Sequence, residues 1–312
     1  MTLKDAQAHH ARLAGEIRRH DHAYYVVGKQ QITDYEYDRL YQELLDLEKQ
    51  FPPLITAESP SQRVGGTPAE GFTRVKHLQP MLSLEKVEPV ENPTKEDEPD
   101  REKRSRMQDQ YTESRIYDFN RSVCRQVGRD PVEYVMEPKV DGVSISVHYR
   151  RGKLALGVTR GDGVYGDDIT TNLRTVRAIP LELAMKNPPA LLEVRGEAYM
   201  ANQDFEALNA KLAAAGEKTL PNARNATAGT LKQLDPRIVA QRPVNAVFYA
   251  VGAFRSGDAP SPNGDSDATA AVLSTGDEAS PSPDLRRGGA ATPFKSHAEM
   301  LKALASFGLP TQ

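Results

Sequence analysis

The 312 residues carry 40 Lys and Arg against 43 Asp and Glu, a net charge of -3, and 38% of them are hydrophobic. This composition is typical of a globular protein of one large or two modest domains, and it excludes a chain whose overall charge attracts nucleic acid. The chain has one cysteine, no apolar run near the ~20 residues of a membrane span, and no apolar secretion segment at its start. We therefore expect a cytoplasmic protein that does not cross a membrane.

The first 51 residues predict two helices. Apolar side chains recur at helical spacing in the first of them, at Leu3, Ala6, Leu13 and Ile17. The second begins at a capping box, in which Thr33 and Glu36 satisfy each other's backbone N–H groups. An apolar stripe over residues 37–45 follows, and Phe51-Pro52-Pro53 ends it. The Pro- and Gly-containing residues 59–71 are expected to form a linker.

From about residue 132 the pattern changes to strands. Residues 143–150 alternate apolar and polar side chains, which is the period of a half-buried strand. Arg151-Gly152 predicts a turn into a second strand at 154–159. Further strands are expected at 191–194 and 244–251, with a helix between them at 203–214. The fold class is therefore α+β with a mostly antiparallel core.

Two segments depart from the globular pattern. Residues 88–106 form a dense mixed-charge run with three prolines, which predicts a solvated insertion ahead of a helix at 116–127. Residues 256–292 are rich in Ser, Pro, Gly, Asp and Ala, which predicts disorder. We expect neither segment to contribute to a site.

The most distinctive motif is Glu137-Pro138-Lys139-Val140-Asp141-Gly142, between two expected strands. A lysine is nucleophilic only when deprotonated, so it needs desolvation or nearby cations to lower its ordinary pKa of ~10.4. The end of a strand can supply both, and Asp141 and Gly142 can shape the turn that aims Lys139. On this motif alone, a surface turn with a solvated lysine is the simpler interpretation.

Later segments supply partners for that lysine. Arg160 lies in TRGDGVYGDDIT, Glu197 ends LEVRGE, and Arg224 and Lys232 both lie in NARNATAGTLK. Cations around Lys139 would neutralise the charge that develops during attack on a phosphate. The pattern therefore favours phosphate-directed nucleophilic chemistry.

In the same order, these segments resemble the NAD-dependent DNA ligases. The resemblance to their nucleotidyltransferase core is closest through KVDG, TRGDGVYGDDIT and NLRTVRAIP, and it continues through LEVRGE and NARNATAGTLKQLDPR. Upstream, ITDYEYDRLYQELLDLE, SPSQRVGG and PMLSLEKV also resemble the family. The resemblance implies a small helical subdomain at 1–70 that binds nicotinamide mononucleotide. An antiparallel-sheet, ATP-grasp-like nucleotidyltransferase core at 71–312 would follow, incomplete at its C-terminal end.

The resemblance also implies the reaction. Lys139 would attack the α-phosphate of NAD, release nicotinamide mononucleotide and carry AMP, for later transfer to the 5′-phosphate of a DNA nick. Ser83, Leu84 and Glu137 would line the adenine pocket. Tyr249 is a candidate wall of that pocket, although an ordinary buried tyrosine is an equal alternative.

Four charged residues receive roles through the same resemblance. Arg160 would hold ribose or phosphate, and Glu197 would meet the ribose and Mg²⁺. Arg224 and Lys232 would serve phosphate and DNA contacts. Family members often carry arginine at the Lys232 position, and lysine keeps the charge but loses the bidentate geometry.

The second expected helix favours NAD over ATP as the substrate. Asp34, Tyr37 and Asp38 share one helix face, where two carboxylates and a ring suit the cationic nicotinamide. The alternative is that both aspartates favour the positive helix N-terminus while Tyr37 packs inward. Tyr24 matches an aromatic of the family, whereas Tyr25 stands where histidine is common, which puts fine positioning of the ring in doubt.

The chain stops at Gln312, before the family strand that reads like DGVVIKV, and it lacks the family's OB-fold, zinc module, helix-hairpin-helix repeats and BRCT domain. We therefore expect a monomer that binds NAD, binds nicked duplex DNA weakly, and does not seal nicks alone. Two alternatives stay open. One is a nucleotide-binding paralogue without catalysis, and the other is an ATP-dependent ligase or capping-type nucleotidyltransferase.

Overall fold

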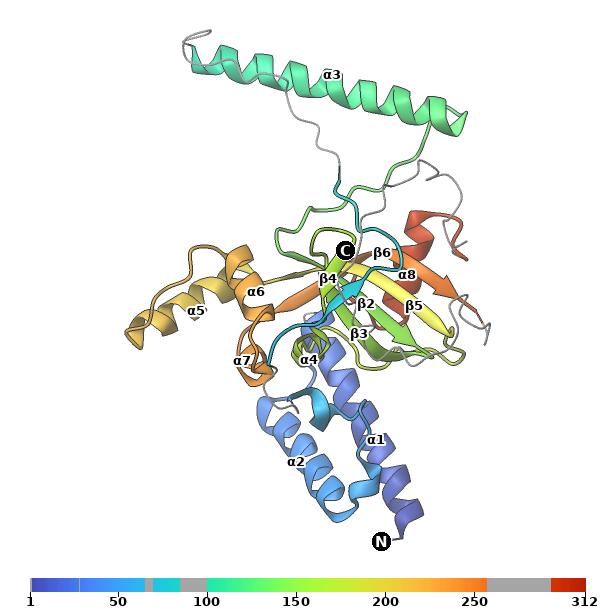
Figure 1. Cartoon of the computed structure of the whole chain (residues 1–312), viewed down its shortest axis with the longest axis vertical. Helices are drawn as coiled ribbons and strands as arrows, with labels where there is room; N and C mark the ends of the chain where they lie inside the picture. The colour runs from blue at the N-terminus through green and yellow to red at the C-terminus, as the bar shows by residue number, and fades with distance from the viewer. Residues whose placement is uncertain (1, 28, 65–69, 85–99, 257–292) are drawn as a thin grey trace, which may run out of the picture. The chain divides into compact units, whose positions relative to one another are not determined.

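The computed structural model describes residues 2–27, 29–64, 70–84, 100–256 and 293–312 (Figure 1). By its internal contacts the chain divides into two units, one formed by residues 1–81 together with 138–312 and the other by residues 82–137. The first unit contains the N-terminal helices and the strands, and the second contains one long helix.

A four-stranded antiparallel sheet forms the centre of the first unit. Its strand order is β3-β2-β5-β6, with β2 at Val143–Arg150, β3 at Lys153–Thr159, β5 at Leu191–Tyr199 and β6 at Asn245–Arg255. The β2–β3 turn places Arg151 and Gly152 at φ of 48° and 80°, a region that Gly adopts without strain. The predicted mixture of helices and antiparallel strands is confirmed.

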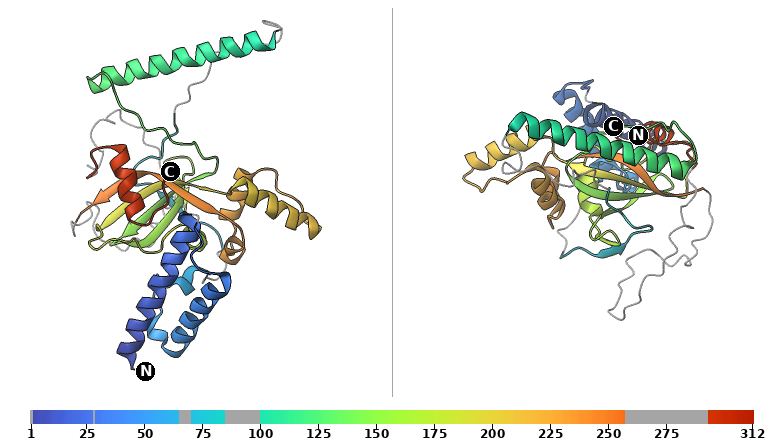
Figure 2. Two further views of the ribbon diagram at one scale, coloured as in Figure 1. Left: turned by 180° about the vertical axis from the view of Figure 1, so that it is seen from behind. Right: turned by 90° about the horizontal axis from the view of Figure 1, so that it is seen from above.

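One face of this sheet is apolar and buried. Ile145, Val147, Leu192 and Val194 have no exposed surface, and burying a side chain of this size stabilises a fold by roughly 1.5–3 kcal/mol. Helices α4 (Thr170–Thr175), α6 (Ala223–Leu231) and α8 (His297–Ser306) contact β3, β5 and β6 respectively (Figure 2). Period-two alternation therefore leaves the polar side chains of β2 and β5 on the opposite face.

Shorter elements connect the strands. A two-stranded ribbon pairs β1 (Arg74–Lys76) with β4 (Tyr165–Asp167). The predicted helix at 203–214 is confirmed as α5 (Asn202–Ala214), and α7 (Pro236–Ala240) precedes β6. Near the end of the chain, the Phe248 backbone N–H of β6 donates to the Pro310 carbonyl oxygen at 2.8 Å.

The two predicted N-terminal helices are present as α1 (Leu3–Asp21) and α2 (Asp34–Gln50), and a π-helical turn, η1 (His22–Val26), extends α1. Both helices begin at capping boxes, at Thr2 and at the predicted Thr33. The two helices share a small apolar core, to which the 3-10 turn η2 (Pro52–Leu54) also contributes. The buried members of this core are Ala6, Leu13, Ile17, Leu44, Leu47 and Leu54.

The linker expected at 59–71 is wrong for its first part. Residues Pro60–Val64 form the 3-10 helix η3. Within it Arg63 is buried, and its guanidinium donates to the carbonyl oxygens of Arg174, Val176 and Ile179 at 3.1–3.3 Å. A side chain with three buried carbonyl partners anchors this segment, so proline here marks a tight turn and not a loose connection.

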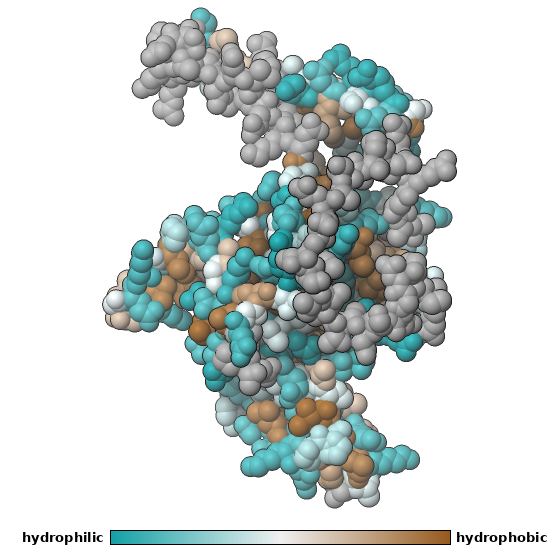
Figure 3. All heavy atoms as spheres, viewed as in Figure 1, coloured by the Kyte–Doolittle hydropathy of each residue, from teal (hydrophilic) through white to brown (hydrophobic). Residues whose placement is uncertain are grey.

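The second unit contains α3 (Arg101–Val127), capped by the Asp100 side chain and ended by Gly128 in the left-handed region. Residues 101–106 of the solvated insertion predicted at 88–106 are helical and not disordered, and the side chains described there are exposed. Apolar side chains such as Ile116 and Phe119 are about half exposed on α3, among mostly hydrophilic neighbours (Figure 3). Residues 85–99, and all of the disorder predicted at 256–292 except Ser256, lie outside the described residues.

Within the part of the chain that the structure describes, no helix is both long enough and apolar enough to cross a membrane.

Candidate functional site

Lys139 lies in the segment that leads into β2, and its side chain is exposed. The turn that follows it is pressed against β5. A Cβ atom on Gly142 would stand 2.1 Å from the Ala198 carbonyl oxygen and 3.0 Å from the Glu197 Cγ. Only glycine permits this approach, which is why the sequence needs Gly142 beside the lysine.

Glu197 is the acidic group of this cluster. It lies opposite Ser144 in the sheet register, and the Ser144 Oγ donates to its Oε2 at 2.8 Å. Burial raises the pKa of the Glu197 carboxyl, against the lowering effects of the Ser144 hydrogen bond and of the Lys139 and Arg224 charges. The structure thus brings three predicted residues, Lys139, Glu197 and Arg224, to one end of the sheet.

Tyr249 of β6 joins the same cluster. Its phenol shares a hydrogen bond with Ser144 and lies in the field of Glu197, Arg195 and Arg160, and burial raises its pKa. Sequence reasoning missed Ser144, although the alternation of residues 143–150 already places it on the polar face.

The predicted cations are held in different ways. Arg224 donates to the Asp141 Oδ1 at 2.9 Å on the surface, and its helix α6 is capped by the Asn222 side chain. Lys232 forms an ion pair with the Asp167 Oδ2 at 2.9 Å, on β4. Both positive charges are therefore already partly neutralised by neighbouring carboxylates.

Arg160 follows β3 and is tied to the cluster through its backbone. Its N–H donates to the Ser144 carbonyl oxygen at 2.9 Å. Its side chain is half-buried, and Nε donates to the Met81 carbonyl oxygen at 3.1 Å. The Met81 carbonyl oxygen therefore helps to orient this guanidinium.

Ser83, Leu84 and Glu137 belong to the second unit. Ser83 and Leu84 are exposed, and Glu137 is half-buried. Their part in an adenine pocket stays a prediction.

The predicted face of α2 divides into two environments. Asp34 and Asp38 are exposed, and Asp34 accepts from the Gln30 Nε2 at 3.1 Å. Tyr37 is half-buried, and its hydroxyl donates to the Asp21 Oδ1 at 2.8 Å while its ring stacks on Tyr41. This packing fits the inward alternative for Tyr37 and leaves the two carboxylates facing solvent.

Arg177 lies at the centre of the aromatic groups near η1. Its guanidinium stands 5.6 Å from the Tyr25 ring centre and 5.7 Å from that of Tyr37, the geometry of a cation–π contact. Asp21 is buried between this arginine and Arg63, with 3.9 Å to a nitrogen of each. Sequence reasoning missed Asp21 and Arg177 because their partners lie on separate elements.

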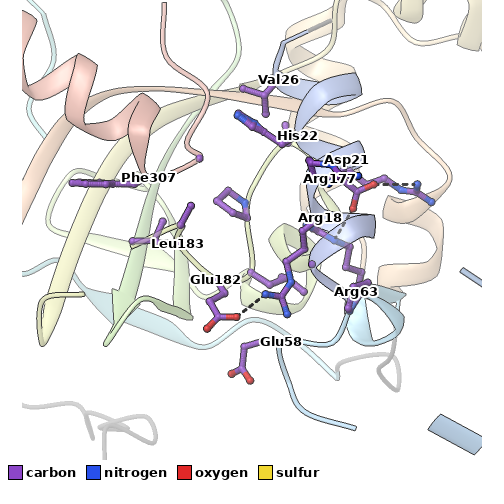
Figure 4. Close-up of a pocket in the computed structure, with 18 of the residues that line it drawn as sticks. Arg18, Asp21, His22, Val26, Glu58, Arg63, Arg177, Glu182, Leu183 and Phe307 are labelled. Carbon is purple, nitrogen blue, oxygen red and sulfur yellow. Dashed lines mark hydrogen bonds and ion pairs between the residues drawn. The ribbon is translucent and has the colours of Figure 1, made fainter. Parts of the chain in front are cut away.

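Two cavities flank this aromatic and charged group. One, of about 530 Å³, opens between η1 and the segment that follows Arg177, with Arg18, Asp21 and His22 on one side (Figure 4). The other, of about 490 Å³, is lined by both Tyr24 and Tyr25. Tyr24 is 53% exposed, so its ring is accessible to a ligand from the second cavity.

Among the described residues, no three His, Cys, Asp or Glu side chains are grouped as ligands for a metal ion. Glu197 supplies a carboxylate in the field of Lys139. A magnesium ion there would take most of its oxygen ligands from phosphate and water, which is the usual coordination of Mg²⁺ in nucleotide sites.

Comparison with known proteins gives two family matches. Residues 101–279 match the NAD-dependent DNA ligase adenylation domain, and residues 3–65 match the DNA ligase-like, N-terminal NAD+-binding domain. The chain is 45% identical over 249 residues to a DNA ligase of Methylacidiphilum infernorum, a stretch that covers 80% of this chain and 33% of the relative. For a DNA ligase of Geobacter metallireducens the identity is 44% over 261 residues, 83% of this chain and 36% of the relative. The chain thus spans about a third of the length of these relatives.

Proposed function

Because this chain belongs to the NAD-dependent DNA ligase family through its NAD+-binding and adenylation domains, we propose that it catalyses their self-adenylation step. The uncharged Lys139 Nζ attacks the α-phosphorus of NAD. A P–N bond forms as the bond from phosphorus to the bridging oxygen breaks, and nicotinamide mononucleotide leaves with that oxygen. The lysine nitrogen gives up a proton to water, because Lys139 is exposed.

The observation that carries this proposal is the cluster at the end of β2 and β5. Gly142 seats the lysine turn beside Glu197, the Ser144 hydroxyl donates to that carboxylate, and Tyr249 hydrogen-bonds to Ser144. We assign to Glu197 the ribose and the magnesium ion, which neutralises phosphate charge when bound.

The remaining predicted residues complete the nucleotide site. Arg160 would contact ribose or phosphate, and Arg224 and Lys232 would contact phosphate once their carboxylate partners are displaced. Ser83, Leu84 and Glu137 would enclose the adenine.

For the nicotinamide half, the exposed carboxylates of Asp34 and Asp38 supply the attraction for a cationic ring. Tyr24 offers an accessible aromatic face for stacking. Tyr37 would act indirectly. Its hydrogen bond to Asp21 fixes the start of α2, which carries Asp34 and Asp38. We accordingly propose residues 1–70 as the nicotinamide-mononucleotide subdomain and residues 71–312 as the nucleotidyltransferase core.

In the whole protein, AMP would pass from the lysine to the 5′-phosphate of nicked duplex DNA, so DNA repair and replication are the proposed context. We propose that this chain is a monomer that works in the cytoplasm and that it self-adenylates without needing DNA.

The test is the intact mass of the chain after incubation with NAD and magnesium. The wild type should gain the mass of one AMP, and Lys139→Ala should gain none. Lys153→Ala is the matched control, because Lys153 lies on β3 and pairs with Glu58 at 3.1 Å, so that variant should keep the adduct. An adduct on Lys139→Ala would refute the assignment of the nucleophile.

A parallel incubation with ATP separates the remaining alternatives. An adduct from ATP at least as fast as that from NAD would favour an ATP-dependent nucleotidyltransferase. Binding of NAD in calorimetry without any adduct would instead favour a nucleotide-binding paralogue that lacks catalysis.

A further inference from the structure

An ion pair with a fully buried carboxylate and a half-buried guanidinium lies on the polar face of the sheet. Glu193 of β5 has no exposed surface, and the Arg195 Nε donates to its Oε1 at 2.9 Å. The Ser146 Oγ, also fully buried, donates to the same oxygen at 2.9 Å. Burying charges costs desolvation energy, which a hydrophobic pair of equal volume would avoid. The presence of the Glu193–Arg195 pair therefore calls for a specific role.

The guanidinium of Arg195 uses its other nitrogens to hold backbone. Nη1 donates to the Pro80 carbonyl oxygen at 3.0 Å, and Nη2 donates to that of Gln79 at 2.7 Å. Both carbonyls belong to the segment His77–Met81, here called the strap. The three nitrogens of the planar guanidinium thus donate to the Glu193 carboxylate and to both strap carbonyls at once. A lysine ammonium would match this geometry less well.

The strap is attached along its other side to the loop that follows β3. The Met81 N–H donates to the Gly163 carbonyl oxygen at 2.8 Å, and the His77 N–H donates to that of Val164 at 2.9 Å. The Met81 carbonyl oxygen in turn accepts from the Arg160 Nε. The strap therefore connects Arg195, inside the sheet, to Arg160, at the proposed nucleotide site.

β6 leaves room for the buried pair at Gly252. A Cβ atom there would stand 2.4 Å from the Glu193 Oε1 and 2.6 Å from the Arg195 Nε. No L-residue larger than glycine could occupy this position without moving the pair. Three strands thus shape one buried bracket, with Ser146 on β2, Glu193 and Arg195 on β5, and Gly252 on β6.

We propose that Arg195 is a positioning residue for NAD. Held by Glu193, it fixes the strap and through Met81 sets the orientation of Arg160, the side chain that the proposed function assigns to ribose or phosphate. This inference rests on that proposed function. Among the contacts described here, Arg195 forms none with Lys139, so its loss should weaken capture of NAD more than it slows attack on bound NAD.

Two variants distinguish a loss of the contacts that Arg195 makes with the strap from a general loss of stability. Glu193→Gln combined with Arg195→Met removes both charges of the pair, so that neither is left unpaired. Arg195→Lys keeps the charge but loses the fork. Arg174→Ala is the control, because Arg174 is also a half-buried arginine that donates to a backbone carbonyl, that of Leu154.

Hydrogen exchange of the His77 and Met81 amides measures the strap without any need for catalysis. The double variant should exchange these amides about tenfold faster or more, Arg195→Lys should give a smaller increase, and the control should match the wild type. Unchanged exchange in a folded double variant would overturn the proposal.

Single-turnover adduct formation measures the consequence for the substrate. The NAD concentration for half-maximal rate should rise about tenfold in the double variant, with the rate at saturating NAD within about threefold of the wild type. Arg195→Lys should recover part of the loss. An equal fall in rate at every NAD concentration would overturn the positioning role. Should the wild type form no adduct, the proposed function fails, while the exchange rates still decide whether Arg195 holds the strap.

Discussion

His148 is a titratable group enclosed in the polar face of the sheet. It is 6% exposed, and its Nε2 lies 3.1 Å from the Ser146 Oγ. Burial lowers its pKa to about 4, against a smaller raising effect of Glu193, and the nearby positive groups lower it further. Those groups are His77, Arg150 and Arg195. At neutral pH the imidazole is therefore uncharged in the folded chain.

This depressed pKa predicts a specific acid sensitivity. The ordinary histidine pKa is 6.5, so below it the unfolded chain binds a proton that the folded chain excludes. The associated stability is complete above about pH 6.5 and is lost as the pH falls toward 4, a loss of about 3 kcal/mol by pH 4. In urea unfolding across this range, His148→Gln should lose that much less stability than the wild type. Parallel pH profiles for the two proteins would contradict the prediction.

Glu197 has the opposite relation to pH. Burial raises its carboxyl pKa, so the folded chain is penalised for the charged form above that pKa, and the penalty disappears below the ordinary value near 4.5. Glu197→Gln should therefore unfold at slightly higher denaturant at pH 7, and the gain should be small because the side chain is only partly buried. The two proteins should converge near pH 4. The same variant should form the AMP adduct more slowly, since the amide gives the magnesium ion no charge.

A Glu197→Gln variant that is less stable at pH 7 would mean that the Ser144 hydrogen bond outweighs desolvation. Adduct formation at the wild-type rate would separate Glu197 from the reaction.

At the scale of elements, α2 depends on the capping box at its start. The Thr33 Oγ1 accepts the Glu36 N–H, and the Glu36 Oε2 accepts the Thr33 N–H at 2.8 Å. Thr33→Ala should cost about 1 kcal/mol of unfolding free energy. Denaturant midpoints of the variant and the wild type test this, and an unchanged midpoint would count against it.

Whether a helix or strand could be predicted from the sequence depends on whether its residues show an apolar period. Strands β2 and β3 were predicted because alternation marks half-buried strands. The predicted strand at 191–194 is too short, because Arg195 and Glu197 lie on the polar face and interrupt an apolar run. The predicted helix at 116–127 is the last part of α3, and residues 101–115 were missed, in part because residues 101–106 have no apolar period. Their charged, helix-favouring side chains and the Asp100 cap form the helix without one.

The candidate site divides in the same way. Lys139, Glu197 and Arg224 could be found because their motifs are local in sequence, and the sheet brings them together. Arg195 and Asp21 could not be found, because each acts through a partner on another segment. Arg195 binds the strap more than a hundred residues earlier in the chain. Such pairings depend on register, which periodicity alone does not give.

For the chain as a whole, the distribution of charge bears on contact with DNA. The net charge is -3, so no long-range field attracts a duplex. The candidate DNA-facing cations are already engaged, Arg224 with Asp141 and Lys232 with Asp167. A phosphate contact by Arg224 or Lys232 must first displace that carboxylate.

We therefore expect weak, strongly salt-dependent binding of nicked duplex and no multiple-turnover sealing by this chain with NAD and magnesium. Binding through Arg160, Arg224 and Lys232 alone would release about three counterions, so the logarithm of affinity should fall with the logarithm of salt concentration with a slope of about -3. Lys232→Ala should reduce that slope by about one, because it removes one phosphate contact. It should also slow adduct formation with NAD, because Lys232, now paired with Asp167, is assigned to the phosphate of the nucleotide. Fluorescence anisotropy over a salt series measures the slope, and a gel assay of nicked duplex measures sealing. A much steeper slope, or repeated sealing at physiological salt, would show that this chain presents a larger phosphate-binding surface than these three cations provide.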